Sequence, residues 1–185
     1  MNIEKVTIED AQALLDIYSY YIENTAITFE YDVPTLEEFK SRISSISSKF
    51  PYIKAVEGNK ILGYAYAASF RTRKAYDWCA ETTIYLDKEC RGKGLGKILY
   101  ETLEKSLKNM GICTIVACVT YTETDDEHLT PASPRFHLKN GFNLIGVFHN
   151  SGYKFNKWYD MAYFEKKIGD YSSSQPPVSF GKWDI

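Results

Sequence analysis

The sequence has 185 residues, of which 44% are hydrophobic and 25% charged, and its formal net charge is −2. This composition is typical of one globular domain and excludes a mainly disordered chain. The near-neutral charge and the absence of a long basic run argue against nucleic acid or an anionic membrane as a partner, and no apolar run approaches membrane-spanning length.

The cysteines, histidines and first residues indicate an intracellular protein without a metal site. The four cysteines form no CxxC pair, and only three histidines are available. Neither a disulfide framework nor a zinc site is therefore expected, and buried free thiols are the better interpretation. The start, MNIEKVTIEDAQALLDIY, lacks the basic-then-apolar layout of a secretory signal. We expect a soluble, cytoplasmic protein.

The first third of the chain predicts a strand and two helices. NIEKVT reads as a short strand, and Thr7 with Asp10 resembles a capping box that opens a helix. The apolar residues of this helix fall on one face, namely Ala11, Leu14, Leu15, Tyr18, Tyr21 and Ile22. Thr35 and Glu38 repeat the capping pattern before a second helix, whose C-terminal half is rich in serine.

The middle of the chain predicts a hairpin and a βαβ-like unit. PYIKAVEGNKILGYAYAASF reads as two strands around Gly58-Asn59, a dipeptide that suits a tight turn. CAETTIYL is a further strand, followed by a glycine-rich stretch, a helix to about Met110 and the strand CTIVACV. This order predicts a right-handed crossover. We therefore expect an α/β fold with a mixed central β-sheet flanked by helices.

The last third predicts a short helix, a strand pair and a tail. Ser133 is expected to cap a helix that ends at Asn140-Gly141. NLIGVFH and KWYDMAYFEKK then read as a closing pair of strands. From Gly169 the sequence is rich in Ser and Pro without a period. We expect a domain over residues 1–168 and a tail over 169–185 that has no fold of its own.

The glycine-rich stretch predicts an anion site. Backbone N–H groups at a helix N-terminus carry the positive end of the helix dipole and bind phosphate oxygens. Glycines there let a pyrophosphate approach the backbone, and this stretch contains Gly92, Gly94 and Gly96. The cations among them are Arg91, Lys93 and Lys97. An ordinary glycine turn is the alternative. A Walker A loop is disfavoured because Ile98 follows the lysine, and the glycine spacing is not GxGxxG.

The same stretch carries a resemblance to a known family. TIYLDKECRGKGLGKILYETL resembles the acetyl-CoA motif of the GNAT N-acetyltransferases, Arg/Gln-x-x-Gly-x-Gly/Ala, which Arg91, Gly94 and Gly96 match. TAITFEYDVPT, GYAYAASFRTRKAYDWCAETTIYL, RFHLKNGF and GYKFNKWYD resemble the phosphinothricin N-acetyltransferase branch, whose members acetylate the α-amino group of small amino-acid analogues. The resemblance runs from about Ile3 to Lys166. It implies a GNAT fold and acetyl-CoA as the acetyl donor.

The resemblance also implies how the acetyl donor is held. In the GNAT fold, the strand before the glycine loop separates from its neighbour and receives the pantetheine arm. Ile84, Tyr85 and Leu86 would then bind pantetheine, and the N–H of Leu86 would polarise the thioester carbonyl. Losing one such oxyanion donor costs about 3–4 kcal/mol in acyl transfer. The pyrophosphate would be cradled by Arg91, Gly92, Lys93, Gly94, Leu95, Gly96 and Lys97.

Two side chains match catalytic positions of the family. An amine nucleophile has to lose a proton at neutral pH, and Glu81 matches the carboxylate that the family uses as a base. A solvent-facing residue on a half-buried strand is the alternative for Glu81. His137 matches a position where the branch has histidine and many GNAT enzymes have the tyrosine that protonates the leaving thiolate. A structural histidine near a helix C-terminus is the alternative for His137.

The acceptor site is the least determined part. Arg71 and Arg73 with Tyr76 would suit a carboxylate or phosphinate through bidentate hydrogen bonds; solvated loop charges are the alternative. Phe29 and Glu30 match positions where the family builds the acceptor wall.

One segment departs from the branch. The acidic insertion TETDDEHLTPAS, Thr122–Ser133, stands where the branch usually has a compact loop with an asparagine that contacts the cofactor. Its negative charge would favour a cationic acceptor, or the segment is a solvated loop.

We therefore expect an acetyl-CoA-dependent N-acetyltransferase that acts by direct attack on a small-molecule amine, namely an amino acid or toxic analogue such as phosphinothricin or methionine sulfone. A polyamine, aminoglycoside or peptide amine is the alternative acceptor, and a CoA-binding module without turnover is the alternative class. Since family members often pair, the resemblance also implies a homodimer.

Overall fold

The computed structural model describes residues 1–185, which fall into two compact units. The first unit comprises Met1–Ile17, Pro34–Ile115 and Lys167–Ile185, and the second comprises Tyr18–Val33 and Val116–Lys166. No helix is both long enough and apolar enough to cross a membrane. All four cysteines are free thiols, two of them buried and two half-buried.

Both predicted capping signals start a helix. The carboxylate of Asp10 accepts hydrogen bonds from the N–H and hydroxyl of Thr7 at 2.8 and 3.2 Å, and the chain enters the 3₁₀ turn η1 (Ile8–Asp10) and helix α1 (Ala11–Asn24). The Thr35 hydroxyl accepts from the N–H of Glu38 at the start of α2 (Leu36–Ser47). The Glu38 carboxylate does not turn back to complete the box but pairs with Arg42 at 2.6 Å.

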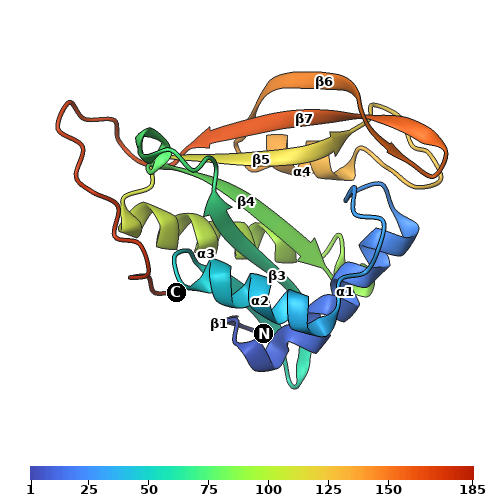
Figure 1. Ribbon diagram of the computed structural model, residues 1–185, viewed down its shortest axis with the longest axis horizontal. Helices are drawn as coiled ribbons and strands as arrows, with labels where there is room; N and C mark the ends of the chain where they lie inside the picture. The colour runs from blue at the N-terminus through green and yellow to red at the C-terminus, as the bar shows by residue number, and fades with distance from the viewer. The chain divides into compact units, whose positions relative to one another are not determined.

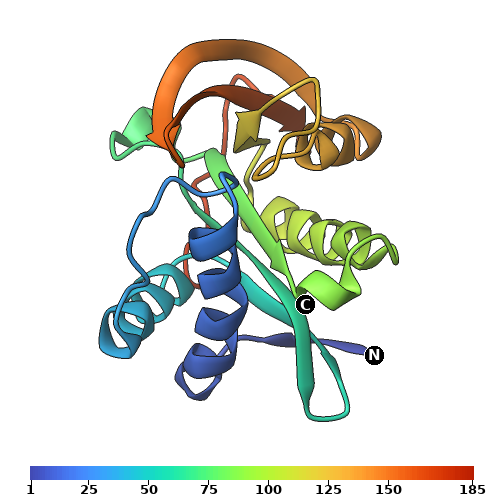
Figure 2. The ribbon, with the colours of Figure 1, turned by 90° about the vertical axis from the view of Figure 1, so that its right-hand side faces the viewer.

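Four antiparallel strands form the sheet of the first unit. They are β1 (Asn2–Lys5), β2 (Tyr52–Glu57), β3 (Lys60–Ser69) and β4 (Cys79–Leu86), each paired with the next. Gly58 adopts φ 59° in the predicted turn between β2 and β3. Helices α2 and α3 (Leu95–Met110) cover opposite faces of β2 and β3 (Figures 1 and 2). The fully buried Leu99, Leu103 and Leu107 form the core stripe of α3.

A crossover between parallel strands is confirmed by the start of β5 (Thr114–Tyr121), and its right-handedness stays a prediction. The N–H groups of Cys113 and Thr114 both donate to the carbonyl oxygen of Trp78, at 2.9 and 3.2 Å. Since Trp78 immediately precedes β4, strands β4 and β5 begin side by side and run in the same direction, joined by α3. The sheet is therefore mixed, with the flanking helices that the sequence predicts.

The second unit contains the rest of β5, helix α4 (Ala132–Lys139) and the antiparallel strands β6 (Asn143–Lys154) and β7 (Lys157–Lys167), in the order β5-β7-β6. The prediction that Ser133 caps α4 is wrong, because Pro131 occupies the N-cap and Ser133 lies inside the first turn. Gly141, at φ 83°, follows the end of α4 as predicted.

The C-terminal tail forms no helix or strand, yet it is held to the first unit by specific contacts. The indole N–H of Trp78 donates to the carbonyl oxygen of Pro176 at 2.8 Å, and the hydroxyl of Ser106 donates to that of Asp184 at 2.5 Å. The ring of Phe180 meets Phe50 edge-on, with centroids 5.4 Å apart. The tail is therefore a packed part of the first unit.

Candidate active site

The glycine loop leads from the 3₁₀ turn η3 (Lys88–Cys90) into α3. Gly92 and Gly94 adopt φ 74° and 82°, a left-handed conformation that side chains with a Cβ rarely tolerate. No protein atom lies within 4 Å of the position that a Cβ would take at either glycine. The loop therefore exposes its backbone, as close approach of a phosphate group requires.

The first N–H groups of α3 are available to such a group. The N–H groups of Lys97 and Ile98 both point back to the carbonyl oxygen of Gly94, at 3.1 and 3.4 Å. The N–H groups that precede them have no acceptor within the helix and carry its positive dipole. Leu95 and Gly96 are buried in the first turn of this helix.

The cations of the loop are exposed and partly engaged. The Lys93 ammonium donates to the carbonyl oxygen of Glu89 at 2.8 Å, which closes the loop on itself. Lys97 lies 3.6 Å from Glu101, one turn further along α3. Arg91 is exposed. The positive field at the start of α3 therefore comes from the helix dipole and these three side chains together.

The backbone of β4 presents one edge away from β3. The N–H of Asp87 donates to Leu62 of β3, and the register between the strands is unbroken from Gly63–Leu86 to Ser69–Ala80. Antiparallel strands alternate bonded and unbonded pairs, so Leu86 and Ile84 direct their N–H and C=O groups away from β3. Trp78 lies an even number of residues before Ile84, and its carbonyl oxygen accepts the hydrogen bonds from the start of β5 on this same edge. Ile84 and Leu86 therefore face the edge that a pantetheine arm would need.

Glycine keeps β3 close to this position. A Cβ at Gly63 would lie 2.6 Å from a methyl carbon of Leu86 and 2.9 Å from the carbonyl oxygen of Tyr85. Any larger residue at Gly63 would therefore displace Leu86.

Glu81 lies on β4 opposite Ala68 and is half-buried. Its neighbours Ala80 and Thr82 are buried on the other face, where the Thr82 hydroxyl lies 3.5 Å from that of Tyr100 in α3. Burial raises the pKa of Glu81, and the charge of Arg71 opposes that rise. A carboxylate with a raised pKa is suited to accept a proton near neutral pH.

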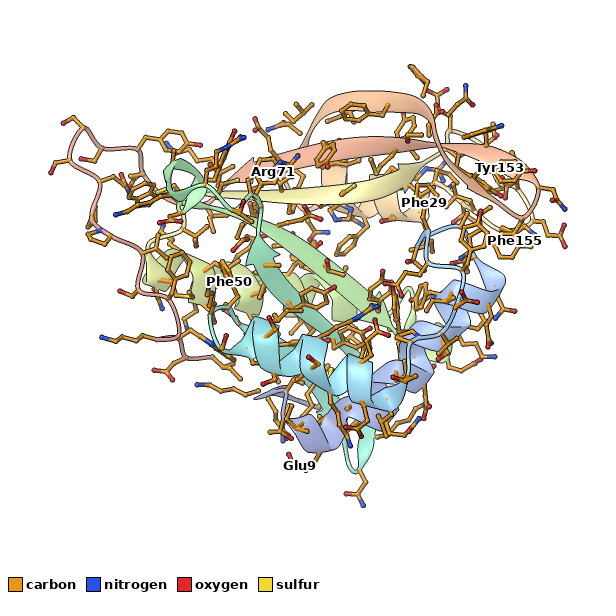
Figure 3. The ribbon with its side chains drawn as sticks, viewed as in Figure 1. Glu9, Phe29, Phe50, Arg71, Tyr153 and Phe155 are labelled. Carbon is orange, nitrogen blue, oxygen red and sulfur yellow. The ribbon has the colours of Figure 1, made fainter.

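The loop before β4 carries three predicted residues, of which Arg71 acts on Glu81. Arg71 lies in this loop just after β3 (Figure 3). Its guanidinium lies over the ring of Phe70 and donates to the carbonyl oxygen of that residue at 2.8 Å. Arg73 is exposed at the N-cap of the 3₁₀ turn η2 (Lys74–Tyr76). Tyr76, at its end, meets Phe70 edge-on at 5.8 Å.

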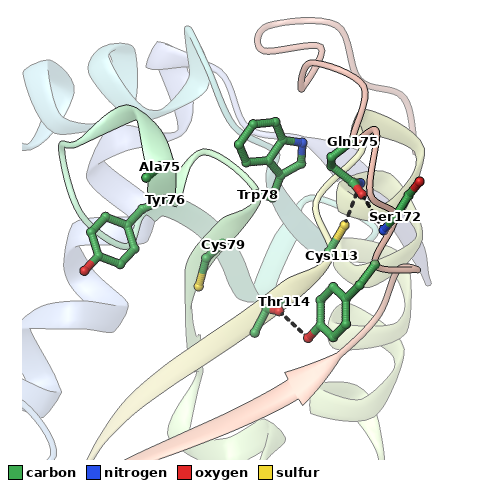
Figure 4. Close-up of a pocket in the computed structure, with 9 residues that line it drawn as sticks. Ala75, Tyr76, Trp78, Cys79, Cys113, Thr114, Ser172 and Gln175 are labelled. Carbon is green, nitrogen blue, oxygen red and sulfur yellow. Dashed lines mark hydrogen bonds between the residues drawn. The ribbon is translucent and has the colours of Figure 1, made fainter.

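Tyr76 also lines a pocket that sequence analysis did not find. Its volume is about 270 Å³, and the C-terminal tail forms one wall (Figure 4). Gln175 donates to the sulfur of Cys113 at 3.1 Å, and Tyr171 shares a hydrogen bond with Thr114 at 2.9 Å. A tail without periodicity gives no signal of such contacts in sequence.

In the second unit, the loop after α1 carries Phe29 and Glu30. The ring of Phe29 lies against Gly152 of β6, so closely that a Cβ there would overlap it. The N–H of Glu30 donates to the hydroxyl of Thr28 at 3.3 Å. Lys154 of β6 is buried beneath this loop and was not singled out from sequence.

His137 is buried in α4, with 3% of its surface exposed. Its Nδ1 lies 2.8 Å from the carbonyl oxygen of Ser133, and its ring packs on Phe142 and Phe164. Burial lowers the pKa of His137 to about 4, so the ring is neutral at pH 7. A neutral ring whose proton lies on Nδ1 has none to give from Nε2. These contacts favour the structural interpretation over the acid.

The acidic insertion is ordered by Asp126. One carboxylate oxygen accepts from the N–H groups of His128 and Leu129 at 2.7 and 2.8 Å, and the other pairs with Lys157 at 2.6 Å. The insertion and the β6–β7 hairpin line a pocket of about 300 Å³ that contains Glu123, Asp126 and Asp160. Its carboxylates exceed its cations, which suits a positively charged group.

Comparisons with known proteins agree with this geometry. The model of the acetyltransferase (GNAT) domain matches residues 3–163. A phosphinothricin N-acetyltransferase of Streptomyces coelicolor is 31% identical, over 86% of this chain and 92% of its own length. An L-methionine sulfoximine/L-methionine sulfone acetyltransferase of Pseudomonas aeruginosa is 24% identical, over 90% and 94%.

The fold is also found among solved structures. A phosphinothricin acetyltransferase from Sinorhizobium meliloti, solved in complex with AcCoA, superposes with a TM-score of 0.85 and 30% identity, covering 95% of this chain and 92% of its own. The phosphinothricin acetyltransferases are thus among its relatives in both sequence and structure, and the chain belongs to the GNAT acetyltransferase family.

Proposed function

We propose that this protein is an acetyl-CoA-dependent N-acetyltransferase whose acceptor is the amino group of a small amino acid or toxic analogue of the phosphinothricin or methionine sulfone type. The observation that carries the proposal is the glycine loop at the start of α3, together with the outward-facing backbone of β4 that precedes it. The names of the relatives support the acceptor class.

The residues on this side fit acetyl-CoA, which when bound supplies an activated acetyl thioester. The N–H groups from Gly92 to Gly96 would hold the pyrophosphate, with Arg91, Lys93 and Lys97 as supporting charges. The outward backbone groups of Ile84 and Leu86 would hold the pantetheine arm, and Tyr85 lies between them with its own N–H and C=O directed to β3. The N–H of Leu86 would donate to the thioester carbonyl oxygen as negative charge develops there.

Glu81 would act as the base and would contact the acceptor amine either directly or through water. It would take a proton from the acceptor ammonium, so that the free amine attacks the acetyl carbon without an acyl-enzyme intermediate. Such general-base catalysis contributes about 10²–10⁴-fold to a rate. No proton from His137 is needed, because the conjugate thiol has a pKa of about 8.5 and CoA can leave as the thiolate.

Arg71, Arg73 and Tyr76 would bind the carboxylate or phosphinate of the acceptor. A planar guanidinium donates two parallel hydrogen bonds to such a group. Phe29 and Glu30 match positions where the family builds the acceptor wall, and they would serve the same purpose here. Of these residues, Arg71 has the strongest support, because its charge already acts on Glu81.

A cationic acceptor such as a polyamine is the second candidate. The acidic pocket around Glu123, Asp126 and Asp160 favours it. Burial raises the pKa of Tyr159 in this pocket, the charge of Asp126 adds to that rise, and the charge of Lys157 opposes it.

We also propose a homodimer and a cytoplasmic location. Strand β6 is an edge strand that exposes Leu144, Ile145 and Phe148, and an exposed apolar edge is a common interface between copies. Light scattering of the wild type and a Phe148→Glu variant tests the dimer; an unchanged mass in the variant would exclude β6 as its interface.

The cytoplasmic location is supported by the four free thiols, which suit a reducing compartment.

The function is tested by release of CoA thiol from acetyl-CoA by the purified protein. The panel contains phosphinothricin, methionine sulfone, ordinary L-amino acids, spermidine and an aminoglycoside. Release with the amino-acid analogues alone supports the proposal. Release with the polycations alone replaces it by the second candidate, and binding of CoA without release to any amine indicates a module without turnover.

A further inference from the structure

Lys154, at the end of β6, is a buried cation with a complete set of partners. Only 3% of its surface is exposed. Its ammonium donates to the carbonyl oxygens of Ile22, Thr25 and Thr28, at 2.7, 2.9 and 2.9 Å. A lysine ammonium has three protons, so every one of them is used within the protein.

These three carbonyl groups belong to the end of α1 and the loop after it. The last four carbonyl groups of a helix have no partner within the helix, and a cation at this end also meets the negative pole of the helix dipole. Lys154 supplies both functions from more than 120 residues away in sequence. It ties the last turn of α1 to Thr28 and so fixes the path of the chain between them.

The two residues before Lys154 contact the same loop. Gly152 receives the ring of Phe29, and the carbonyl oxygen of Tyr153 accepts a hydrogen bond from the hydroxyl of Tyr31. We call Gly152–Lys154 the β6 clamp. Figure 3 shows Phe29, Tyr153 and Phe155 gathered at this end of the second unit. Each clamp residue therefore contacts a residue between Thr28 and Tyr31.

The clamp is itself held rigidly by the turn that follows. Phe155 and Asn156 adopt φ 51° and 58° between β6 and β7, a conformation that is rare outside glycine and is retained where surrounding contacts fix it. The ring of Phe155 stacks on His128 with centroids 3.8 Å apart and lies 5.1 Å from the Lys154 ammonium. Lys154 is thus a fixed anchor and not a mobile surface lysine.

Glu30 links the clamp to the proposed acceptor wall by charge as well. Burial opposes the charged form of Lys154, and the Glu30 carboxylate favours it. Glu30 and the carbonyl groups therefore all stabilise the ammonium in its place.

We propose that Lys154 is a positioning residue for acceptor binding. It holds the segment that carries Phe29 and Glu30 in the shape of the acceptor wall and takes no part in holding acetyl-CoA. The inference rests on the proposed function, since it is that function which gives Phe29 and Glu30 their role.

The test is a steady-state comparison of Lys154→Met with Lys40→Met, using the acceptor that the wild type turns over best. Lys40→Met loses the same charge, but Lys40 lies on α2, where its ammonium pairs with Glu37 of the same helix. We expect Lys154→Met to raise the acceptor KM by about tenfold or more and to leave the acetyl-CoA KM within about twofold of wild type. Lys40→Met should leave both values near those of the wild type.

A second variant acts on the same wall without changing a charge. Gly152→Ala would push the ring of Phe29 from its place, so it should also raise the acceptor KM selectively. If circular dichroism shows that Lys154→Met is unfolded, the acceptor KM of Gly152→Ala tests the inference in its place. An unchanged acceptor KM in the folded variant, or a rise in both KM values alike, overturns the inference.

The outcome is separable from that of the proposed function. If the wild type acetylates no amine in the panel, the proposed function fails before any variant is compared. If the wild type turns over an amine and the folded variants keep its KM, the function stands and only the role of Lys154 is lost.

Discussion

Replacing Gly94 by alanine tests the glycine loop with a magnitude that follows from the structure. Gly94 has φ 82° and ψ −6° at the N-cap of α3. A residue with a Cβ loses roughly 1–2 kcal/mol in this left-handed conformation. No protein atom lies within 4 Å of the new Cβ, so backbone strain is the whole cost to stability. For a chain of this size, the melting temperature should fall by roughly 2–8 °C.

The effect on acetyl-CoA is separate and larger. The new methyl group would project into the space beside the N–H groups that are proposed to hold the pyrophosphate. Each hydrogen bond to a charged group contributes about 1.5–3 kcal/mol, so loss of one should weaken acetyl-CoA binding by roughly 10- to 150-fold. Isothermal titration with acetyl-CoA measures this loss directly, and differential scanning calorimetry measures the stability.

Gly58→Ala is the matched control. Gly58 has φ 59° in the β2–β3 turn and likewise has no atom within 4 Å of a Cβ. It should show a similar fall in melting temperature with unchanged binding of acetyl-CoA. If Gly94→Ala binds acetyl-CoA as tightly as Gly58→Ala does, the reasoning about the loop is refuted.

Four further outcomes are expected. Glu81→Gln should lower kcat by about 10²–10⁴-fold without a change in circular dichroism; retained activity would exclude Glu81 as the base. Because the Arg71 charge lowers the pKa of Glu81, Arg71→Ala should raise that pKa and move the acid limb of the kcat/KM profile to higher pH, whereas Arg71→Lys should leave it in place. The wild type should lose stability as the pH falls from 6.5 to about 4, because His137 is protonated in the unfolded chain over this range before it is protonated in the folded chain. In urea titrations over the same range, His137→Phe should lose less stability than the wild type, and it should keep its activity. A folded but inactive His137→Phe variant would restore the acid role. Truncation after Ile168 should cost at least about 3 kcal/mol in urea unfolding, counting only the hydrogen bonds from Trp78 and Ser106 and the Phe50–Phe180 contact; unchanged stability would show that the tail is dispensable.

Local signals explain why much of the fold could be predicted from sequence. The capping pattern at Thr7, the Gly58 turn and the β4 segment depend on residues near one another in the chain, and each has the expected structure. The glycine loop is of the same kind, because positive φ and a following helix are local properties. The prediction that Ser133 caps α4 was wrong because Pro131, two residues earlier, occupies the N-cap.

The contacts that sequence could not supply are those between distant segments. Lys154 reads as an ordinary strand lysine until β6 brings it beneath the end of α1, where its partners are backbone carbonyl groups that carry no mark in the sequence. His137 has the residue type of a proton donor, but the surrounding Phe142 and Phe164 place it in an apolar environment. The tail has no period, yet the ring of Phe180 and the amide of Gln175 contact Phe50 and Cys113, which lie far away in the sequence.

A competition experiment tests the central claim most directly. The purified protein is given acetyl-CoA and an equimolar mixture of methionine sulfone, phosphinothricin, ordinary L-amino acids, spermidine and an aminoglycoside, and the products are identified by mass spectrometry. We expect N-acetylated amino-acid analogues as the main products, and we expect these products to be lost with Glu81→Gln. Acetylated polycations alone, or no acetylated amine at all, would contradict it.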